Sequence, residues 1–190
     1  MLTDAKKKEL LVFYTIVQTN KCSLRELSQV LSIPKRTIKE IIRKLNGTIF
    51  QQLSIPRFIY STAKGELKLD SQHKDEKMAI FHYIKLFFLR ESNRFNFLLL
   101  LFDSPHSRVS KKILLEKLYI SPSYLEKLTN QLNKSLKKFH LQIISRQNCY
   151  ILKGDELSIR IYMYFFFSDA FQGIDWPLTN MKLSQVKHTH

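Results

Sequence analysis

Cysteine, glycine, acidic residues and long apolar runs are all scarce in this chain. Its 190 residues include only two cysteines, Cys22 and Cys149, which lie far apart and outside any CxxC pair. This usage gives no support to a disulfide framework or a zinc site, and it indicates unpaired, partly buried thiols in a reducing compartment. The few glycines form no phosphate-cradling loop; they are Gly47, Gly65, Gly154 and Gly173.

Enzymatic chemistry has little basis in the sequence. The histidines are scattered, without HExxH or paired-ligand spacing; they are His73, His82, His106, His140, His188 and His190. Asp103 and Asp169 have no acid–base partner nearby in the sequence. We therefore expect no enzyme activity, no catalytic residue, no bound metal and no cofactor.

The most apolar run covers only residues 97–102, which is far too short to span a bilayer. The N-terminal segment 1–8 is charged and leads directly into an amphipathic helix, so we expect no signal peptide. Together these features predict a cytoplasmic protein without a membrane partner.

Basic residues outnumber acidic ones by 31 to 16, which gives a net charge of +15 at pH 7. The excess is confined to two consecutive segments, because residues 1–70 carry a net +7, residues 71–155 a net +8 and residues 156–190 no net charge. Such a distribution predicts that both basic segments face phosphate. Lysine-rich chains are also often simply well solvated, so the charge alone does not decide the matter.

A repeat within the basic part of the chain favours nucleic acid. Segments 23–46 and 110–133 match each other at a constant offset of 87 residues. Each segment reads as a short helix, a tight turn and a second helix, which is the helix-turn-helix pattern. The aligned apolar pairs are Leu27 and Leu114, Leu31 and Leu118, Ile33 and Ile120, Ile38 and Leu125, Ile41 and Leu128, and Leu45 and Leu132. Two such units on a strongly basic chain predict binding to double-stranded DNA.

Before the first turn, the sequence predicts two helices. The first is expected over about 5–19, with Asp4 as its N-cap. The second is expected over 24–31, where Ser23 and Glu26 have the spacing of a capping box.

After the turn, Pro34 suits the first position of a third helix that we expect to end near Asn46, with Gly47 just past its end. Strand-like residues over 58–60 and 67–69 then predict a wing hairpin.

The second unit is expected to follow the same plan on a larger base. Helices over about 75–90 and 94–102 form that base, and Ser110 caps a helix over 111–118. Ser121 caps the next helix, which has Pro122 in its first turn and continues to about Lys138.

The second wing is the clearer one, with two strands in 141–152 and a tip at 146–148. A neutral, very aromatic helix over 156–171 follows, and such a helix needs burial against a larger body. We therefore predict a mainly α fold with small β-wings, in which tandem winged helix-turn-helix domains precede a linker helix. The expected domains are 1–70, 75–154 and a third segment over 155–190.

The outer face of each second helix supplies the candidate site. In the first unit, a rotation of about 100° per residue places Arg36, Glu40 and Arg43 opposite the apolar stripe of Ile38, Ile41, Ile42 and Leu45. Residues near the start of such a helix reach base edges in the major groove. The expected DNA contacts of this unit are Lys35, Arg36, Thr37, Lys39 and Arg43. A solvated basic face is the alternative.

The second unit presents a less basic face with more amide and hydroxyl groups, which is typical of base reading combined with phosphate contacts. Its expected contacts are Ser123, Tyr124, Lys127, Asn130 and Lys134, flanked by Gln131. Arg146 at the second wing tip, and Arg57 or Lys64 in the first wing, are expected to touch phosphate or enter a minor groove. Simple exposure to solvent is the alternative for these wing residues.

The end of the second wing carries a family resemblance. The segment 150–156, YILKGDE, is followed by Ile159-Arg160, the aromatic helix and Trp176-Pro177. With the tandem helix-turn-helix units, this pattern resembles the Mga-type regulators, the M-protein trans-acting positive regulators and AtxA-like proteins of Gram-positive bacteria.

The resemblance implies a transcription factor, usually an activator of virulence or carbohydrate-responsive genes. It also implies regulatory domains beyond this chain, self-association into a homo-oligomer in a full-length form, and contact with RNA polymerase. On that basis the chain is either the DNA-binding part of a longer regulator or a short relative. Two other functions stay open: a plasmid replication initiator or partition protein, and a winged-helix scaffold that binds protein.

Overall fold

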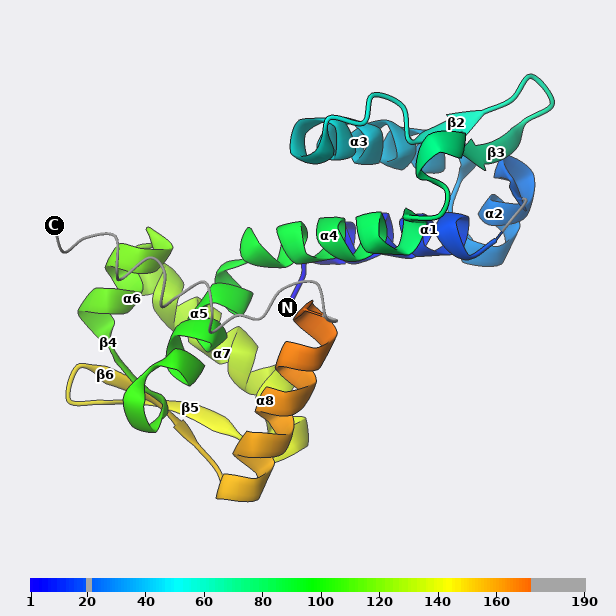
Figure 1. Cartoon of the computed structure of the whole chain (residues 1–190). Helices are drawn as coiled ribbons and strands as arrows, with labels where there is room; N and C mark the ends of the chain where they lie inside the picture. The colour runs from blue at the N-terminus through cyan, green and yellow to red at the C-terminus, as the bar shows by residue number, and fades with distance from the viewer. Residues whose placement is uncertain (20–21, 172–190) are drawn as a thin grey trace, which may run out of the picture. The chain divides into compact units, whose positions relative to one another are not determined.

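The computed structural model describes residues 1–19 and 22–171 and divides into two compact units. The N-terminal unit is Thr3–Phe88, and the C-terminal unit comprises Met1–Leu2 and the chain from Leu89 onward (Figure 1). Each unit is helical with one small antiparallel sheet, which confirms the predicted fold class. Some expectations lie outside the described residues, namely those for Gly173, Trp176-Pro177, His188, His190 and the segment after residue 171.

The first helix, α1 (Asp4–Gln18), begins one residue earlier than predicted. Thr3 has extended backbone angles and accepts a hydrogen bond from the Lys6 amide at 3.3 Å, so Thr3 is the N-cap. The prediction of Asp4 as the cap is wrong. Asp4 lies in the first turn, where its carboxylate pairs with Lys7 at 3.1 Å. Its negative charge also interacts favourably with the positive N-terminal end of the helix dipole.

The core of the N-terminal unit includes a helix that we had expected in the second unit. The ring of Phe13 on α1 lies 5.4 Å from that of Phe81 on α4 (Lys77–Arg90), and 6.1 Å from that of Phe58. The unit boundary accordingly falls within α4, after Phe88. The apolar face of α1 therefore packs against Phe81 of α4 as well as against α3.

Helices α2 (Leu24–Leu31) and α3 (Lys35–Leu53) form the first helix-turn-helix. The predicted capping box is confirmed: Ser23 Oγ accepts from the Glu26 amide at 3.2 Å, and the Ser23 amide donates to Glu26 Oε2 at 2.7 Å. The hydrogen bond from the Ser23 amide is the main cause that lowers the pKa of the Glu26 carboxyl, and the Ser23 side chain lowers it further. Pro34 is the N-cap of α3 and not its first residue.

Helix α3 continues well past the predicted end at Asn46. Leu45 and Ile49 are both fully buried, one turn apart, so the apolar stripe extends through Gly47. Burial of this extra turn outweighs the poor helix propensity of one glycine, which is about 1 kcal/mol. Ser54, with a left-handed φ of 59°, ends the helix instead.

The two sheets have the same topology. In the N-terminal unit, β1 (Cys22–Ser23), β2 (Ile59–Ser61) and β3 (Glu66–Leu69) lie in the order β1-β3-β2. In the C-terminal unit, β4 (Arg108–Ser110), β5 (Gln142–Arg146) and β6 (Cys149–Lys153) lie in the order β4-β6-β5. Every pairing is antiparallel. In each unit, the second strand of the wing therefore pairs with the short strand that precedes the helix-turn-helix: β3 pairs with β1, and β6 pairs with β4.

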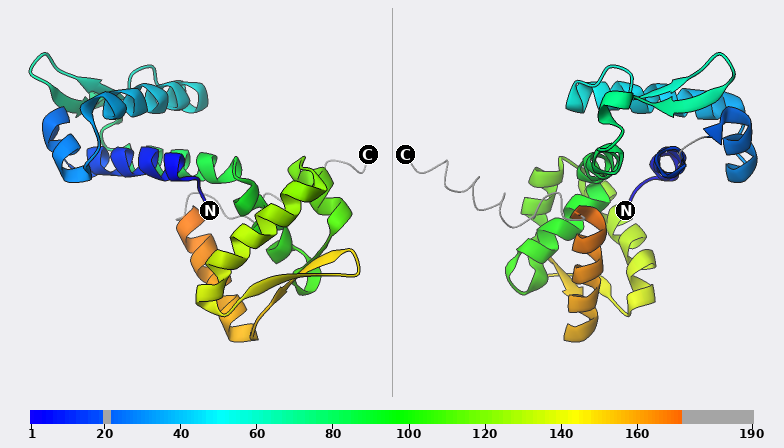
Figure 2. Two further views of the ribbon diagram at one scale, coloured as in Figure 1. Left: turned by 180° about the vertical axis from the view of Figure 1, so that it is seen from behind. Right: turned by 45° about the vertical axis from the view of Figure 1, so that its right-hand side comes forward.

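The C-terminal unit packs α5 (Asn93–Asp103), α6 (Lys111–Leu118) and α7 (Pro122–Leu136) around buried leucines and the Phe97 ring. Ser110 and Ser121 cap α6 and α7, as predicted. Helix α7 ends in a short 3₁₀ helix, η3 (Lys137–Phe139), and lies beside the β5–β6 hairpin (Figure 2).

Helix α8 (Glu156–Phe171) buries only part of its aromatic surface. The ring of Phe166 stacks on that of Phe95 of α5, with the centroids 4.9 Å apart. Leu157, Tyr164 and Phe165 stay more than half exposed. The expectation that this helix needs a larger partner is therefore met on one face only.

In each unit an asparagine bonds the wing to the second helix of the helix-turn-helix, which is α3 or α7. Asn46 Nδ2 donates to the Ile59 carbonyl at 2.7 Å, and the Ile59 amide donates to Asn46 Oδ1 at 2.9 Å. Asn133 forms the same pair of bonds with Ile143, at 2.9 and 2.6 Å. Because Asn46 and Asn133 occupy the same position in the repeat, this clamp is a duplicated device that sets the wing against the helix.

Replacing the clamp should weaken the unit that holds it. We expect Asn133→Ala to lower the free energy of unfolding of the C-terminal unit by about 1–3 kcal/mol, because the Ile143 amide and carbonyl lose their partners. The Ile143 amide should also exchange with deuterium faster. Asn130→Ala is the matched control, since Asn130 is exposed one turn earlier on α7. Equal stability of the two variants would show that Asn133 is not a clamp.

Candidate DNA-binding surface

The tight turn before each second helix has the same backbone in both units. Ser32 in the first turn and Tyr119 in the second both adopt a left-handed φ of 53°. In the first turn, Ser28 Oγ donates to the Ile33 carbonyl at 2.7 Å, and Ile33 is buried. The turn thus holds the start of the second helix against the first. The outer face of the second helix is presented as one surface.

The structure brings the candidates of the first unit together on α3. Lys35, Arg36, Lys39 and Arg43 are all exposed, while Thr37 is half-buried. Arg36 Nε lies 3.5 Å from Glu40 Oε1. These residues line one open pocket: Lys35, Arg36, Lys39, Glu40 and Arg43. A dense positive surface with one carboxylate at its centre results.

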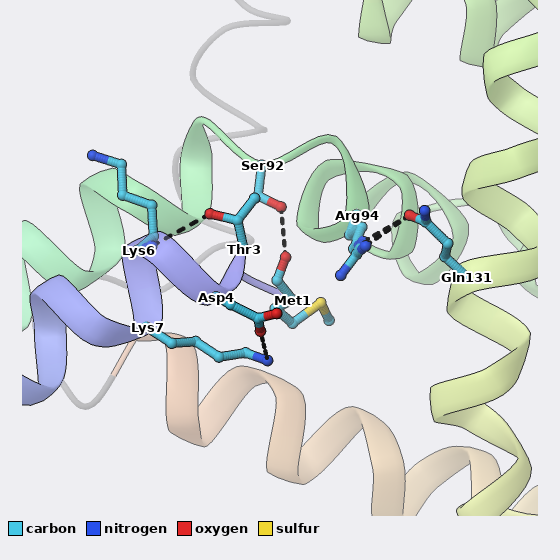
Figure 3. Close-up of polar contacts among 8 residues, drawn as sticks. All are labelled: Met1, Thr3, Asp4, Lys6, Lys7, Ser92, Arg94 and Gln131. Carbon is cyan, nitrogen blue, oxygen red and sulfur yellow. Dashed lines mark hydrogen bonds and ion pairs between the residues drawn. The ribbon is translucent and has the colours of Figure 1, made fainter. Parts of the chain in front are cut away.

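The candidates of the second unit also share one face of α7. Those that are exposed are Ser123, Tyr124, Lys127, Asn130 and Lys134. Gln131 differs from them, because its Oε1 accepts from Arg94 Nη2 at 2.7 Å and from Arg94 Nε at 3.2 Å (Figure 3). Gln131 therefore links α7 to α5 and does not belong to the exposed face.

The wings place their basic residues differently. Arg146 is the last residue of β5 and is exposed, next to a two-residue turn in which Gln147 and Asn148 both have positive φ. Lys64 lies exposed in the loop between β2 and β3, beside Gly65 with φ 79°. Arg57 lies before β2, with its guanidinium 5.9 Å from the centre of the Tyr60 ring. Arg146 and Lys64 therefore sit at wing tips, and Arg57 does not.

Each wing tip also holds the helix-turn-helix in place. The Leu24 amide at the start of α2 donates to the Gly65 carbonyl at 3.3 Å. The Lys111 amide at the start of α6 donates to the Asn148 carbonyl at 2.8 Å. In each unit the wing is thus hydrogen-bonded at its tip to the first helix of the motif and through the asparagine clamp to the second.

The repeat offset reveals how the two faces differ. Arg36 corresponds to Ser123, and Arg43 corresponds to Asn130. Two other positions exchange charge: Lys39 corresponds to Glu126, and Glu40 corresponds to Lys127. The same backbone therefore carries two chemically distinct exposed faces.

Sequence reasoning missed the structural role of Asn46 and Asn133. The signal was present, because both copies of the repeat end on the same residue, Asn46 and Asn133. The shared position does not show what the asparagines bond to, and only the structure reveals their bonds to the wing strand.

Two helix-turn-helix motifs, each followed by a β-hairpin tied to its second helix, define a tandem winged helix-turn-helix protein, which is a class of DNA-binding module. Comparison with known families is more specific for the C-terminal unit. Residues 79–167 match the family model of the Mga helix-turn-helix domain. This match agrees with the resemblance found in the sequence, and it begins within α4 and ends within α8.

A relative extends the similarity beyond that domain. A protein of Streptococcus pneumoniae serotype 4, named "Putative trans-acting regulator", is 22% identical over 164 residues. The matched region is 85% of this chain and 31% of that protein, so the chain spans about a third of the relative's length.

The matched family model describes a helix-turn-helix domain, which is a DNA-binding module. Within residues 1–19 and 22–171, no group of His, Cys, Asp or Glu side chains could hold a metal ion. In the same ranges, no helix is long and apolar enough to cross a membrane. Both cysteines in the described ranges are free thiols; Cys22 is buried and Cys149 is partly exposed.

The exposed arginines of α3 should contribute to sequence discrimination. We expect Arg36→Ala and Arg43→Ala to weaken binding to a selected site more than binding to random duplex, because a bidentate contact to guanine is worth about 1–3 kcal/mol of discrimination. Competition between the two duplexes measures this difference. Arg25→Ala on α2 is the comparison, since the first helix of such a motif crosses the phosphate backbone. Equal losses on both duplexes would make Arg36 and Arg43 phosphate contacts.

Proposed function

We propose that this chain is the DNA-binding part of a transcriptional regulator that recognises an extended operator through both of its winged helix-turn-helix units. The observation that carries the proposal is the pair of exposed second helices, each preceded by the same left-handed turn and fixed by the same asparagine clamp. Lys35, Arg36, Thr37, Lys39 and Arg43 form the first reading face. The second is formed by Ser123, Tyr124, Lys127, Asn130 and Lys134, with Arg146 at its wing.

The charge of the chain supports this assignment. The basic excess lies in residues 1–155, which contain both units, and residues 156–190 carry none. Base-edge recognition needs side chains that point away from the core, and phosphate binding needs Lys and Arg around them. Both requirements are met on α3, whereas α7 offers amide and hydroxyl groups with fewer cations.

The finer parts of the proposal follow the family. We propose that the regulator acts in the cytoplasm as an activator of virulence or carbohydrate-responsive genes, with contact to RNA polymerase and self-association in a full-length form. The similarity to the Streptococcus pneumoniae protein named as a trans-acting regulator supports a role in transcription.

Genome-wide footprinting of the intact protein in its host tests this function. We expect sites upstream of promoters, and we expect those sites to be lost in the variant with both Arg36→Ala and Arg43→Ala. Iterated sites beside a replication gene would instead support a replication initiator. No sites, together with unchanged function of the arginine variant, would support a protein-binding scaffold and contradict the proposal.

A further inference from the structure

We propose that Glu40 is a specificity-determining residue that accepts a hydrogen bond from a cytosine amino group in the major groove, next to the base contact of Arg36. The inference rests on the proposed function and assigns a role to the one acidic residue on the α3 reading face. Helical spacing places Glu40 on the outer face of this helix, but Glu40 is not among the DNA contacts expected from the sequence.

The position of Glu40 places it among the reading residues. It follows Arg36 by one helical turn and precedes Arg43 by three residues, and its side chain is 54% exposed. The Arg36 side chain is 92% exposed, and its Nε lies 3.5 Å from Glu40 Oε1. This contact engages Nε, while the terminal amino groups of an arginine are the donors suited to guanine O6 and N7.

The fold does not require a carboxylate at this position. Lys127 occupies the equivalent place on α7, where it is exposed on the same helix face. The C-terminal unit therefore shows that a basic residue fits this position. An exposed ion pair at this spacing contributes little stability, so the pair with Arg36 does not explain Glu40.

The carboxylate also opposes general DNA affinity. A negative charge in the middle of the α3 face repels phosphate, whereas Lys127 at the same place in α7 attracts it. The Glu40 carboxylate suits a hydrogen-bond donor on a base edge, because Glu and Asp accept from cytosine N4 in the major groove. Adenine N6 is also a donor, but it lies beside the N7 acceptor, which repels a carboxylate. Cytosine is therefore the base that this residue fits.

The test compares discrimination with overall affinity in the full chain. A site is first selected from a random duplex pool with the wild-type chain, and its affinity is measured beside that of a scrambled duplex of the same composition at one salt concentration. Glu40→Gln keeps the size of the side chain and removes its charge. Glu116→Gln is the matched control, because Glu116 is a similarly exposed carboxylate that pairs with Lys112 at the same i,i+4 spacing, outside both reading helices. Thermal melting of both variants should match the wild type.

We expect Glu40→Gln to bind the scrambled duplex more tightly than the wild type does. The ratio of selected to scrambled affinity should fall by about tenfold or more, the loss typical of one base-edge contact. A second selection with Glu40→Gln should lose its preference for cytosine at one position. Glu116→Gln should leave the ratio unchanged.

Two results would overturn the inference, and they are distinguishable. If the wild type discriminates between the duplexes but Glu40→Gln keeps the same ratio and the same selected site, Glu40 is only a solvated partner of Arg36. If the wild type binds both duplexes equally or not at all, the proposed function fails as well.

Discussion

Raising the salt concentration from about 50 to about 200 mM should lower the affinity of this chain for duplex DNA by on the order of 10³- to 10⁵-fold. The reason is counterion release, because each phosphate contacted by Lys or Arg frees a condensed cation. The net +7 of residues 1–70 and +8 of residues 71–155 provide enough cations for about 6–10 such contacts.

Fluorescence anisotropy across that salt range measures the effect. The slope of log affinity against log salt reports how many phosphates are contacted. Lys7→Ala with Lys8→Ala provides a control on the slope, since both residues are exposed on α1 and belong to neither reading helix. A flat response of the wild type would contradict DNA binding through a charged surface.

Disabling either reading face alone should cost on the order of 10²- to 10⁴-fold in affinity. Two units on one chain give the second contact an effective concentration of roughly millimolar, and the gain from such linkage is of that size. The variants are Arg36→Ala with Arg43→Ala in the N-terminal unit, and Lys127→Ala with Asn130→Ala in the C-terminal unit.

A double lysine variant controls for the loss of charge. Lys7→Ala with Lys8→Ala removes as much charge as the arginine variant, yet we expect it to change affinity far less. If one reading-face variant kept full affinity for the selected duplex, that unit would be structural and reading by both units would be refuted.

The helix-turn-helix units could be predicted from the sequence because their signals are local. The spacing of Ser23 and Glu26 defines a capping box, and the apolar stripe through Ile38, Ile41 and Leu45 defines the buried face of α3. Neither signal depends on residues far away in the chain. The wings could also be predicted, from the strand-like residues around Gly65 and around the turn after Arg146.

What the sequence did not reveal depends on contacts between distant residues. Helix α4 joins the N-terminal unit because Phe81 contacts Phe13, a preference that no local pattern encodes. Gly47 has the signature of a helix end, yet the burial of Ile49 carries α3 past it. The bond from Arg94 to Gln131 removed Gln131 from the exposed face of α7 for the same reason.

The exposure of the reading face of α3 was predictable from helical spacing, and its contact with DNA stays a prediction. Helical spacing alone put Arg36 and Arg43 on the outer surface, and the structure places them there. The exchange of Glu40 for Lys127 follows from the repeat offset in the sequence, whereas the contact between Arg36 and Glu40 is seen only in the structure.

Methylation protection of guanine N7 by the intact chain, on a duplex selected from a random pool, tests the central claim most directly. Guanine N7 lies in the major groove, where the second helix of a helix-turn-helix is inserted. We predict two separate protected tracts on one duplex, of which the first is lost with Arg36→Ala and Arg43→Ala and the second with Lys127→Ala and Asn130→Ala. Protection of a single tract that only one of these variants removes, or no protection at all, would contradict recognition by both units.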